Sequence, residues 1–331
     1  MLDDRKTAIL AAVVQEYIAT AQPVGSASIV RSEVVNVSSA TVRNELAALE
    51  RDGYLVQPHT SAGRIPTDQG YRYFVDHLTD PGPLDPATRR QVGEFFSAAH
   101  GRLEEMLLQT SNLLADLTHN AAVVVGPRSE AVAVRRIQLV GLSESSATVV
   151  VVFANGSVEN VAVELRPGDD DERLAAASAH LSEHLDGTVL GAGASLEPSG
   201  DGDLDRLCTS ALVAIQTVAS TDHVYTGGAS EVARAFDAVD VVRSVLHTLE
   251  QQFVVVTLVS EIVDRGMSVA IGGEHGYEPL SACSVVVKPV VVDGEHLGSV
   301  GVLGPTRMDY PLELATVDVV STQLGHRIEE G

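Results

Sequence analysis

The chain has 331 residues, of which 45% are hydrophobic and only two are cysteine, and its formal net charge is −23. This length and apolar content predict about two domains with buried cores, and two cysteines provide no disulfide framework. Residues 1–6 are charged and lack the apolar core of a signal peptide, and no apolar run approaches the roughly 20 residues of a membrane span. We therefore expect a cytoplasmic protein with no membrane partner.

The negative charge is unevenly distributed along the chain. Residues 1–78 hold seven Lys or Arg and nine Asp or Glu, a net charge of −2, which leaves 15 against 36, a net charge of −21, for the remainder. Because phosphate contacts need positive charge, the acidic remainder disfavours nucleic acid, whereas the nearly neutral N-terminal part can still present arginines. We expect modest non-specific affinity for DNA, so that a short specific site matters more than bulk charge.

The N-terminal segment predicts two helices separated by a break. Residues 3 to about 20 carry apolar side chains at helical spacing, and residues 22–26 interrupt that pattern with Pro and Gly. Ser26 is then expected to cap a short second helix. The apolar positions of the two helices are Ile9, Leu10, Val13, Val14, Tyr17 and Ile18, followed by Ile29, Val30 and Val34.

A third helix is predicted to begin near residue 38 and to end near Gly53. A serine at its start can accept a hydrogen bond from an unpaired backbone N–H, and glycine commonly follows a helix end. One face is an apolar stripe of Val42, Leu46 and Leu49, and the side chains of Thr41, Arg43 and Asn44 point away from it. Arg can bind guanine and Asn can bind adenine through paired hydrogen bonds, so this outer face has the groups needed to read base edges.

Residues 57–66 follow as a short polar loop between two regular segments, typical of a β-wing with Arg64 near its tip. Three helices followed by a wing is the order of a winged helix-turn-helix domain. The alternative is an ordinary small helical domain, but the exposed Ser/Thr/Arg/Asn face and the arginine in the loop favour DNA binding. Thr67 can cap a further helix, and residues 79–84 form the best linker, a possible hinge.

Asp85 and Pro86 predict the start of one long helix. Its apolar residues recur at alternating steps of four and three, which fits either a helix packed on its own domain, the reading we favour, or a coiled-coil seam. These residues are Ala99, Leu103, Met106, Thr110, Leu113 and Leu117.

The middle of the chain predicts a compact α/β unit. Strands are expected at 137–142, 148–153 and 158–165, with a hairpin turn at 154–157, and two helices follow, the first beginning after Asp169, Asp170 and Asp171. Three carboxylates there could bind a hard cation, but they more commonly favour the positive end of a helix.

The last third mixes helices with a strand pair. A helical region at 230–251, strands at 284–292 and 298–303 with a turn at Asp293-Gly294, and a closing helix from Leu312 are expected. Residues 253–259 fit either a buried strand or a helix, and we leave them open. The spaced glycines Gly298, Gly301 and Gly304 indicate close packing of a strand rather than a phosphate-binding loop.

One motif suggests an enzyme. His180, Glu183 and His184 match the H-x-x-E-H pattern of inverted zincins, with two imidazoles on one helix face beside a possible general base. A solvated helix face is the better interpretation, because one short pattern is weak evidence and a third ligand has no clear candidate. No nucleophile–base set has a local signature, so we predict no enzyme activity, no cofactor and no metal.

Two long motifs, taken together, resemble those of a known family. The segment Ser38-Ser39-Ala40-Thr41-Val42-Arg43-Asn44, continuing through 58–67 and Gly70-Tyr71-Arg72, and the segment 298–310 closely resemble the HrcA family of bacterial heat-inducible transcription repressors. This resemblance implies an α+β multidomain fold. It comprises an N-terminal winged helix-turn-helix domain (1–78), a linker (79–84), a GAF-like α/β domain (85–135 and 221–331) and an inserted α/β dimerisation domain (136–220).

The resemblance also implies a dimeric repressor that binds an inverted-repeat operator of chaperone operons on double-stranded DNA and is kept active by the GroEL-type chaperonin. The DNA-contacting residues would be Ser38, Ser39, Thr41, Arg43, Asn44, His59, Ser61 and Arg64. Two alternatives are a winged-helix regulator whose GAF-like domain senses a small ligand, and the zinc hydrolase described above. Three β-prone, uncharged segments, 149–153, 254–256 and 285–287, could aggregate if packing failed.

Overall fold

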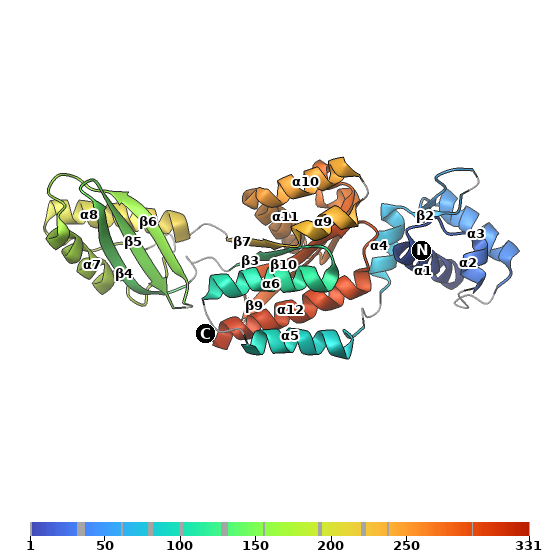
Figure 1. The fold of residues 1–331 in the computed structure, drawn as a ribbon, viewed down its shortest axis with the longest axis horizontal. Helices are drawn as coiled ribbons and strands as arrows, with labels where there is room; N and C mark the ends of the chain where they lie inside the picture. The colour runs from blue at the N-terminus through green and yellow to red at the C-terminus, as the bar shows by residue number, and fades with distance from the viewer. Residues whose placement is uncertain are drawn as a thin grey trace.

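The computed structural model describes every residue except 1, 32–36, 61, 79–81, 99–101, 127–131, 155, 191–193, 220–222, 237, 293 and 331. It is an elongated α+β protein with three parts in a row (Figure 1). We call them the head (residues 2–78), the body (82–126 and 223–330) and the distal module (132–219). Among the described residues, no helix is both long enough and apolar enough to cross a membrane.

The head contains four helices and a two-stranded sheet. Its elements are α1 (Asp4–Thr20), α2 (Ser26–Arg31), α3 (Ser39–Arg51), β1 (Leu55–Val56), β2 (Ile65–Pro66) and α4 (Asp68–Asp76), with β1 and β2 antiparallel. The apolar stripes expected for α1 and α3 are buried against each other, with Ile9, Leu10, Val42 and Leu49 all inaccessible to solvent. The first and third predicted helices are thus confirmed. The second helix is also present, but Ser26 is its first residue rather than its cap, and Val34 lies outside the described residues.

The body is a five-stranded antiparallel sheet with helices on both faces (Figure 1). Its strand order is β7 (Val224–Gly227), β3 (Ala121–Val125), β10 (Glu295–Pro305), β9 (Cys283–Val292) and β8 (Val269–Ile271). One face carries α5 (Pro86–Ala98), α6 (Leu103–Thr118) and α12 (Tyr310–Glu330), and the other carries α9 (Ala229–Ala235), α10 (Val239–Glu250) and α11 (Gln252–Asp264). Alternate residues of β3 face these two cores, which explains its continuous apolar sequence.

The prediction of one long helix from Pro86 is wrong, because α5 ends at Ala98 and α6 begins at Leu103. Both helices contact α12, which lies between them (Figure 1), so the chain must reverse for both apolar faces to reach the same partner. Ala99 lies outside the described residues. Leu103 and Leu113 join the core shared with α12, as expected for a helix packed on its own domain.

Residues 253–259, which the sequence left open, form part of the helix α11. Val255, Leu258, Val259 and Ile262 are buried at helical spacing against the sheet. Phe253 at the start of this helix remains 83% exposed. The β-branched composition of this segment therefore reflects an apolar packing face rather than a strand.

The glycines of β10 permit close packing, as predicted, and the segment is a strand. A Cβ atom built on Gly298 would lie 2.2 Å from the carbonyl oxygen of Val125, and one on Gly304 would lie 2.1 Å from Oδ1 of Asn120. Both distances are far inside van der Waals contact. Only glycine lets β10 approach β3 and the Asn120 side chain this closely.

Asn120 also binds a buried carboxyl group. Its Nδ2 donates to Oε1 of Glu313 over 2.7 Å, while Oε2 of Glu313 has no hydrogen-bond partner among the described residues. Burial raises the pKa of Glu313 to about 8, and the negative charge of Asp309 acts in the same direction, whereas the Asn120 hydrogen bond opposes it. This glutamate is therefore mainly protonated at neutral pH.

The distal module is an antiparallel sheet in the order β4 (Val134–Ser143), β5 (Ser146–Phe153) and β6 (Val158–Glu164), covered by α7 (Asp171–Leu185) and α8 (Gly202–Ala219). The predicted strands and the hairpin between β5 and β6 are confirmed, with Gly156 at a φ of 82°. Asp170 caps α7, and Asp169 binds Arg206 through both carboxylate oxygens at 2.8 Å. The acidic run thus starts a helix and anchors the next one.

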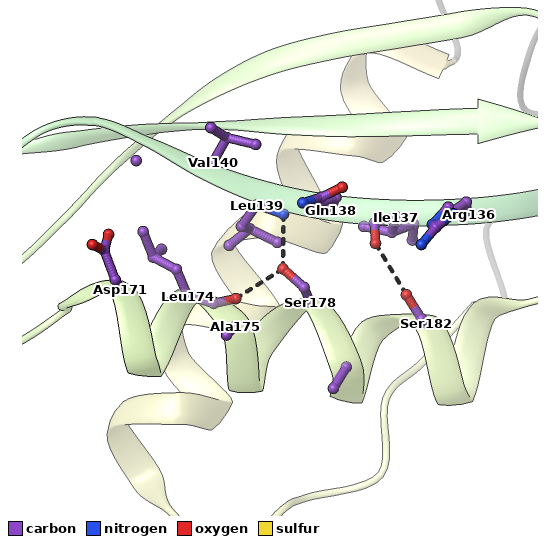
Figure 2. A pocket seen from close by; sticks show the side chains of 12 residues that line it. Arg136, Ile137, Gln138, Leu139, Val140, Asp171, Leu174, Ala175, Ser178 and Ser182 are labelled. Carbon is purple, nitrogen blue, oxygen red and sulfur yellow. Dashed lines mark hydrogen bonds between the residues drawn. The ribbon is translucent and has the colours of Figure 1, made fainter.

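The free edge of β4 is covered by α7. Figure 2 shows Ser178 and Ser182 of α7 reaching the strand backbone: the N–H of Leu139 donates to Ser178 over 2.8 Å, and Ser182 donates to the carbonyl of Ile137 over 3.0 Å. A groove of about 530 Å³ lies between the strand and the helix. These hydroxyls occupy edge groups that would otherwise pair with another strand.

The helix α4 connects head and body. The guanidinium of Arg72 binds both carboxylate oxygens of Glu274 and donates to the carbonyl of Val269 over 2.8 Å. Tyr71 packs on Tyr310, with ring centroids 5.8 Å apart. The predicted linker begins after α4, and its residues 79–81 lie outside the described part. A hinge there could not release the head unless the α4 contacts also broke.

Candidate nucleic-acid interface

The start of α3 is organised by hydroxyl groups. Ser38 caps the helix, and its Oγ accepts from the N–H of Thr41 over 3.2 Å and lies 3.0 Å from the Thr41 hydroxyl. Ser39 lies 3.3 Å from the hydroxyl of Ser26, the first residue of α2. The predicted cap is confirmed, and the polar groups of the two helix starts form one continuous patch.

Arg43 is exposed and partly fixed in direction. Its Nε donates to the hydroxyl of Ser26 over 3.3 Å, and the terminal nitrogens Nη1 and Nη2 have no hydrogen-bond partner among the described residues. Two terminal N–H groups in a fork are what a bidentate contact with guanine requires. Asn44, next to it, is also exposed, and its side chain makes no hydrogen bond within the described part of the chain.

The C-terminal end of α3 is hydrogen-bonded to the cap of α4. Gly53 takes a φ of 84°, and the N–H of Tyr54 donates to the carbonyl of Leu49 over 2.9 Å, as in a Schellman motif. Thr67, the cap of α4, donates its hydroxyl hydrogen to the carbonyl of Gly53 over 2.6 Å. The orientation of α3 is therefore set by the helix that also contacts the body.

The loop beside α3 is held by the side chain of Gln57. Nε2 of Gln57 donates to the carbonyls of Thr60 and Ala62, the latter over 2.8 Å. His59 is exposed on this loop, and Ser61 lies outside the described residues. The loop thus presents His59 to solvent beside α3 in a defined conformation.

Arg64 lies at the base of this loop, so its predicted position near the tip is wrong. Its backbone pairs with Val24 through hydrogen bonds of 2.8 and 2.9 Å, directly beside the β1–β2 pairing. Its guanidinium binds Glu50 of α3 over 2.8 Å. The strand pattern was too short to locate the turn, and the partner Val24 lies 40 residues earlier in the chain.

We expect Gly63→Ala to destabilise the head, because a Cβ at this position would lie 2.5 Å from the backbone of Val24. Moving that backbone would disturb the pairing of Val24 with Arg64 at a cost of roughly 1–3 kcal/mol. Thermal and urea unfolding would measure the loss. Gly93→Ala in α5, where a Cβ meets nothing within 4 Å, is the control and should be neutral or stabilising. Equal stability of the two variants would contradict the proposed close approach.

The two histidines of the H-x-x-E-H pattern are engaged with the backbone. The ring of His180 bonds the carbonyl of Glu197 through Nε2 over 2.9 Å, and that of His184 bonds the carbonyl of His180 through Nδ1 over 2.8 Å. Within the described residues, no group of three or more His, Cys, Asp or Glu side chains is arranged to hold a metal ion. These contacts agree with a structural role for the helix face.

The space between the body sheet and the helices α10 and α11 is nearly filled. The cavity there measures about 10 Å³ and is lined by apolar side chains such as Val123, Leu258 and Val285. A larger cavity of about 250 Å³ lies beside α12, between Leu84, Lys288 and Val317. The cavity that the described residues form beneath α10 and α11 is therefore too small for a ligand.

Comparison with known proteins identifies the family. Residues 104–312 match the family model described as HrcA protein C terminal domain. A Nocardia farcinica protein named Heat-inducible transcription repressor HrcA is 39% identical over 339 residues, covering 99% of this chain and 97% of that protein. A protein of the same name from Mycolicibacterium vanbaalenii is 38% identical over 334 residues, covering 98% and 97%.

One solved structure, described as the crystal structure of a hypothetical protein at 2.2 Å resolution, shares the fold. It matches with a TM-score of 0.71 at 23% identity, covering 100% of this chain and 99% of that one. The identity over nearly full length, together with the family match, settles the classification that the two sequence motifs suggested. The chain belongs to the HrcA family of heat-inducible transcription repressors.

Proposed function

We propose that this protein represses chaperone operons by binding, as a dimer, to an inverted-repeat operator. The observation that carries the proposal is the two-sided character of α3. Arg43 and Asn44 are exposed on its outer face, and the opposite face is buried in the core of the head through Val42, Leu46 and Leu49. Two such helices related by a two-fold axis would enter successive major grooves. The repressor names of the relatives support this role.

The proposed contacts follow from the position of each group. Thr41, Arg43 and Asn44 would meet base edges, while the hydroxyls of Ser38 and Ser39 at the helix start would meet phosphates. The loop residues His59 and Ser61 would lie against the backbone or the minor groove. Arg64 would support the loop through Glu50 rather than reach DNA itself.

The three-part structure supports the proposed domain division. Three helices, the β1–β2 hairpin and α4 would form a winged helix-turn-helix domain over 1–78, followed by the linker at 79–84. The five-stranded sheet with its helices would be the GAF-like domain (85–135 and 221–331). The three-stranded sheet with α7 and α8 has a hydrophobic core of its own, as expected for an inserted domain, and would be the dimerisation domain (136–220) that the family resemblance implies.

The family resemblance further suggests that a GroEL-type chaperonin keeps the repressor active and that heat, by diverting the chaperonin, releases the operons. The β-prone segments 149–153 and 285–287 lie in the interior strands β5 and β9, where strand pairing and packing protect them only while the fold is intact. A small-ligand sensor is the second candidate: the 10 Å³ cavity beneath α10 and α11 disfavours a ligand there, so the cavity of about 250 Å³ beside α12 would be its site. A zinc hydrolase is a remote third candidate, which metal analysis of the purified protein would test.

A gel-shift titration tests the proposal. The probes are a duplex carrying the inverted repeat upstream of a chaperone operon and a scrambled duplex of equal composition, at several salt concentrations, with and without chaperonin. We expect binding to the repeat at least about a thousandfold tighter than to the scrambled duplex, and a larger active fraction with chaperonin. Equal weak binding to both duplexes would overturn the proposed operator, and full activity after heating without chaperonin would overturn the chaperonin mechanism.

A further inference from the structure

We propose that Arg51, at the C-terminal end of α3, binds a DNA phosphate and anchors the recognition helix to the backbone beside the bases that Arg43 reads. This inference rests on the proposed function, because it concerns the same DNA surface. It assigns the backbone-anchoring role to a residue that the sequence motifs did not indicate.

The first argument is the exposure pattern of α3. Apart from the adjacent pair Arg43 and Asn44, the exposed residues of this helix recur at steps of three and four, so they form one stripe opposite the buried one. Arg51 ends the stripe that contains Arg43 and Asn44, two of the three proposed base-reading side chains. The stripe consists of Ala40, Arg43, Asn44, Ala47 and Arg51.

The second argument is the length of the stripe. Eight residues separate Arg43 from Arg51, which corresponds to about 12 Å along a helix that rises about 1.5 Å per residue. The major groove is about 12 Å wide, so a helix that reads bases near its start meets the phosphates at the groove edge near its end. Ala47, between the two arginines, has a side chain small enough to allow a close approach.

The third argument concerns the charges around Arg51. The neighbouring acidic side chains already have cationic partners: Glu50 binds Arg64 over 2.8 Å, and Asp52 lies 3.9 Å from Lys6 of α1. Earlier on α3, Glu45 binds Arg5 over 2.7 Å. The side chain of Arg51 is exposed and forms no hydrogen bond or ion pair with any residue that the structure describes.

This pattern separates two kinds of arginine on the head. Arg64 is engaged with Glu50 and with the backbone of Val24, so binding a phosphate would require it to leave a stabilising contact. Arg51 could bind a phosphate without losing any contact. An unpaired cation costs least to transfer from water and counterions to a phosphate.

The test compares the salt dependence of operator binding by wild-type full-length protein and by Arg51→Gln. The probes are the inverted-repeat duplex and the scrambled duplex. We expect Arg51→Gln to weaken binding to both duplexes by a similar factor, roughly fivefold to tenfold per head at 0.1 M salt, and to reduce the slope of log K against log salt by about one per head. The ratio of the two affinities should stay close to that of the wild type.

Two controls exclude simpler explanations. Arg90→Gln removes an exposed arginine of α5, far from α3, and should leave the slope unchanged. The charge-neutral double variant Glu50→Gln/Arg64→Gln should lower the unfolding temperature but keep the wild-type slope. Because Arg51 also lies at the C-terminal end of a helix, where a cation stabilises the fold, unfolding of Arg51→Gln is measured in parallel, and a purely structural role would lower stability without changing the slope.

The outcomes are distinguishable from failure of the proposed function. If the wild type does not prefer the inverted repeat, the operator proposal fails. If the wild type prefers it and Arg51→Gln keeps the full salt slope, the operator proposal stands and the assignment of Arg51 is overturned. A slope change in the Glu50/Arg64 double variant instead would transfer the anchoring role to Arg64.

Discussion

Arg43→Ala is expected to remove most of the operator preference while leaving the fold intact. The side chain is exposed and contributes one weak hydrogen bond to Ser26, so its truncation leaves no buried group unpaired. A good bidentate contact with guanine is worth about 1–3 kcal/mol of discrimination, so the affinity ratio between operator and scrambled duplex should fall roughly tenfold to a hundredfold per head. Gel-shift titrations on both duplexes measure this ratio.

A matched variant makes the Arg43 result specific. Arg43→Lys keeps the charge but loses the planar fork, so it should retain much of the binding to scrambled DNA and still lose operator preference. If Arg43→Ala instead weakened both duplexes equally, the arginine would be a phosphate contact rather than a base reader. Circular dichroism and unfolding temperature should match those of the wild type in both variants.

The buried carboxyl of Glu313 is expected to make the protein less stable as pH rises. Its pKa is about 8 in the folded protein and near the ordinary value of 4.5 when unfolded. Between these values the folded state keeps a proton that the unfolded state has released, so rising pH favours unfolding. This group's contribution is fully present below about pH 4.5 and decreases through the window up to about pH 8, at roughly 1.4 kcal/mol per pH unit at most.

Glu313→Gln should remove that dependence, because the amide can still accept from Asn120 and carries no ionisable proton. Urea unfolding at several pH values between 5 and 9 would show that the free energy of unfolding of the variant increases relative to that of the wild type as pH rises, with the largest difference above about pH 8. Glu329→Gln, at the far end of the same helix, is the control. Parallel pH profiles for wild type and Glu313→Gln would contradict a buried, protonated carboxyl.

The helix α3 was predictable because its signals are local. Ser38 as cap, Gly53 after the end and the stripe of Val42, Leu46 and Leu49 all lie within one short segment, and each matches what the structure shows. The strands of the distal module were predictable for the same reason, since their alternation and the hairpin glycine Gly156 are read within a few residues.

The features that the sequence did not predict depend on distant partners. The apolar period after Pro86 continues through both α5 and α6, and only the position of α12 shows why the chain reverses between them. The position of Arg64 depends on its contacts with Val24 and Glu50. Arg51 differs from Arg64 because the acidic residues next to it are paired with other cations. Periodicity describes a segment, whereas these contacts depend on where other segments lie.

The contacts of α4 bear on which spacing between two DNA half-sites the proposed dimer would accept. The helix α4 contacts the end of α3 through the hydrogen bond from Thr67 to Gly53. It contacts the body through the hydrogen-bonded ion pair of Arg72 with Glu274. In the proposed dimer, the distance between the two recognition helices would then be fixed by rigid protein rather than by the reach of a flexible tether. Such a dimer would bind half-sites at only one separation and one rotational phase along the DNA. A repeat with base pairs added at its centre would therefore be bound more weakly, even if the sequence of each half-site were unchanged.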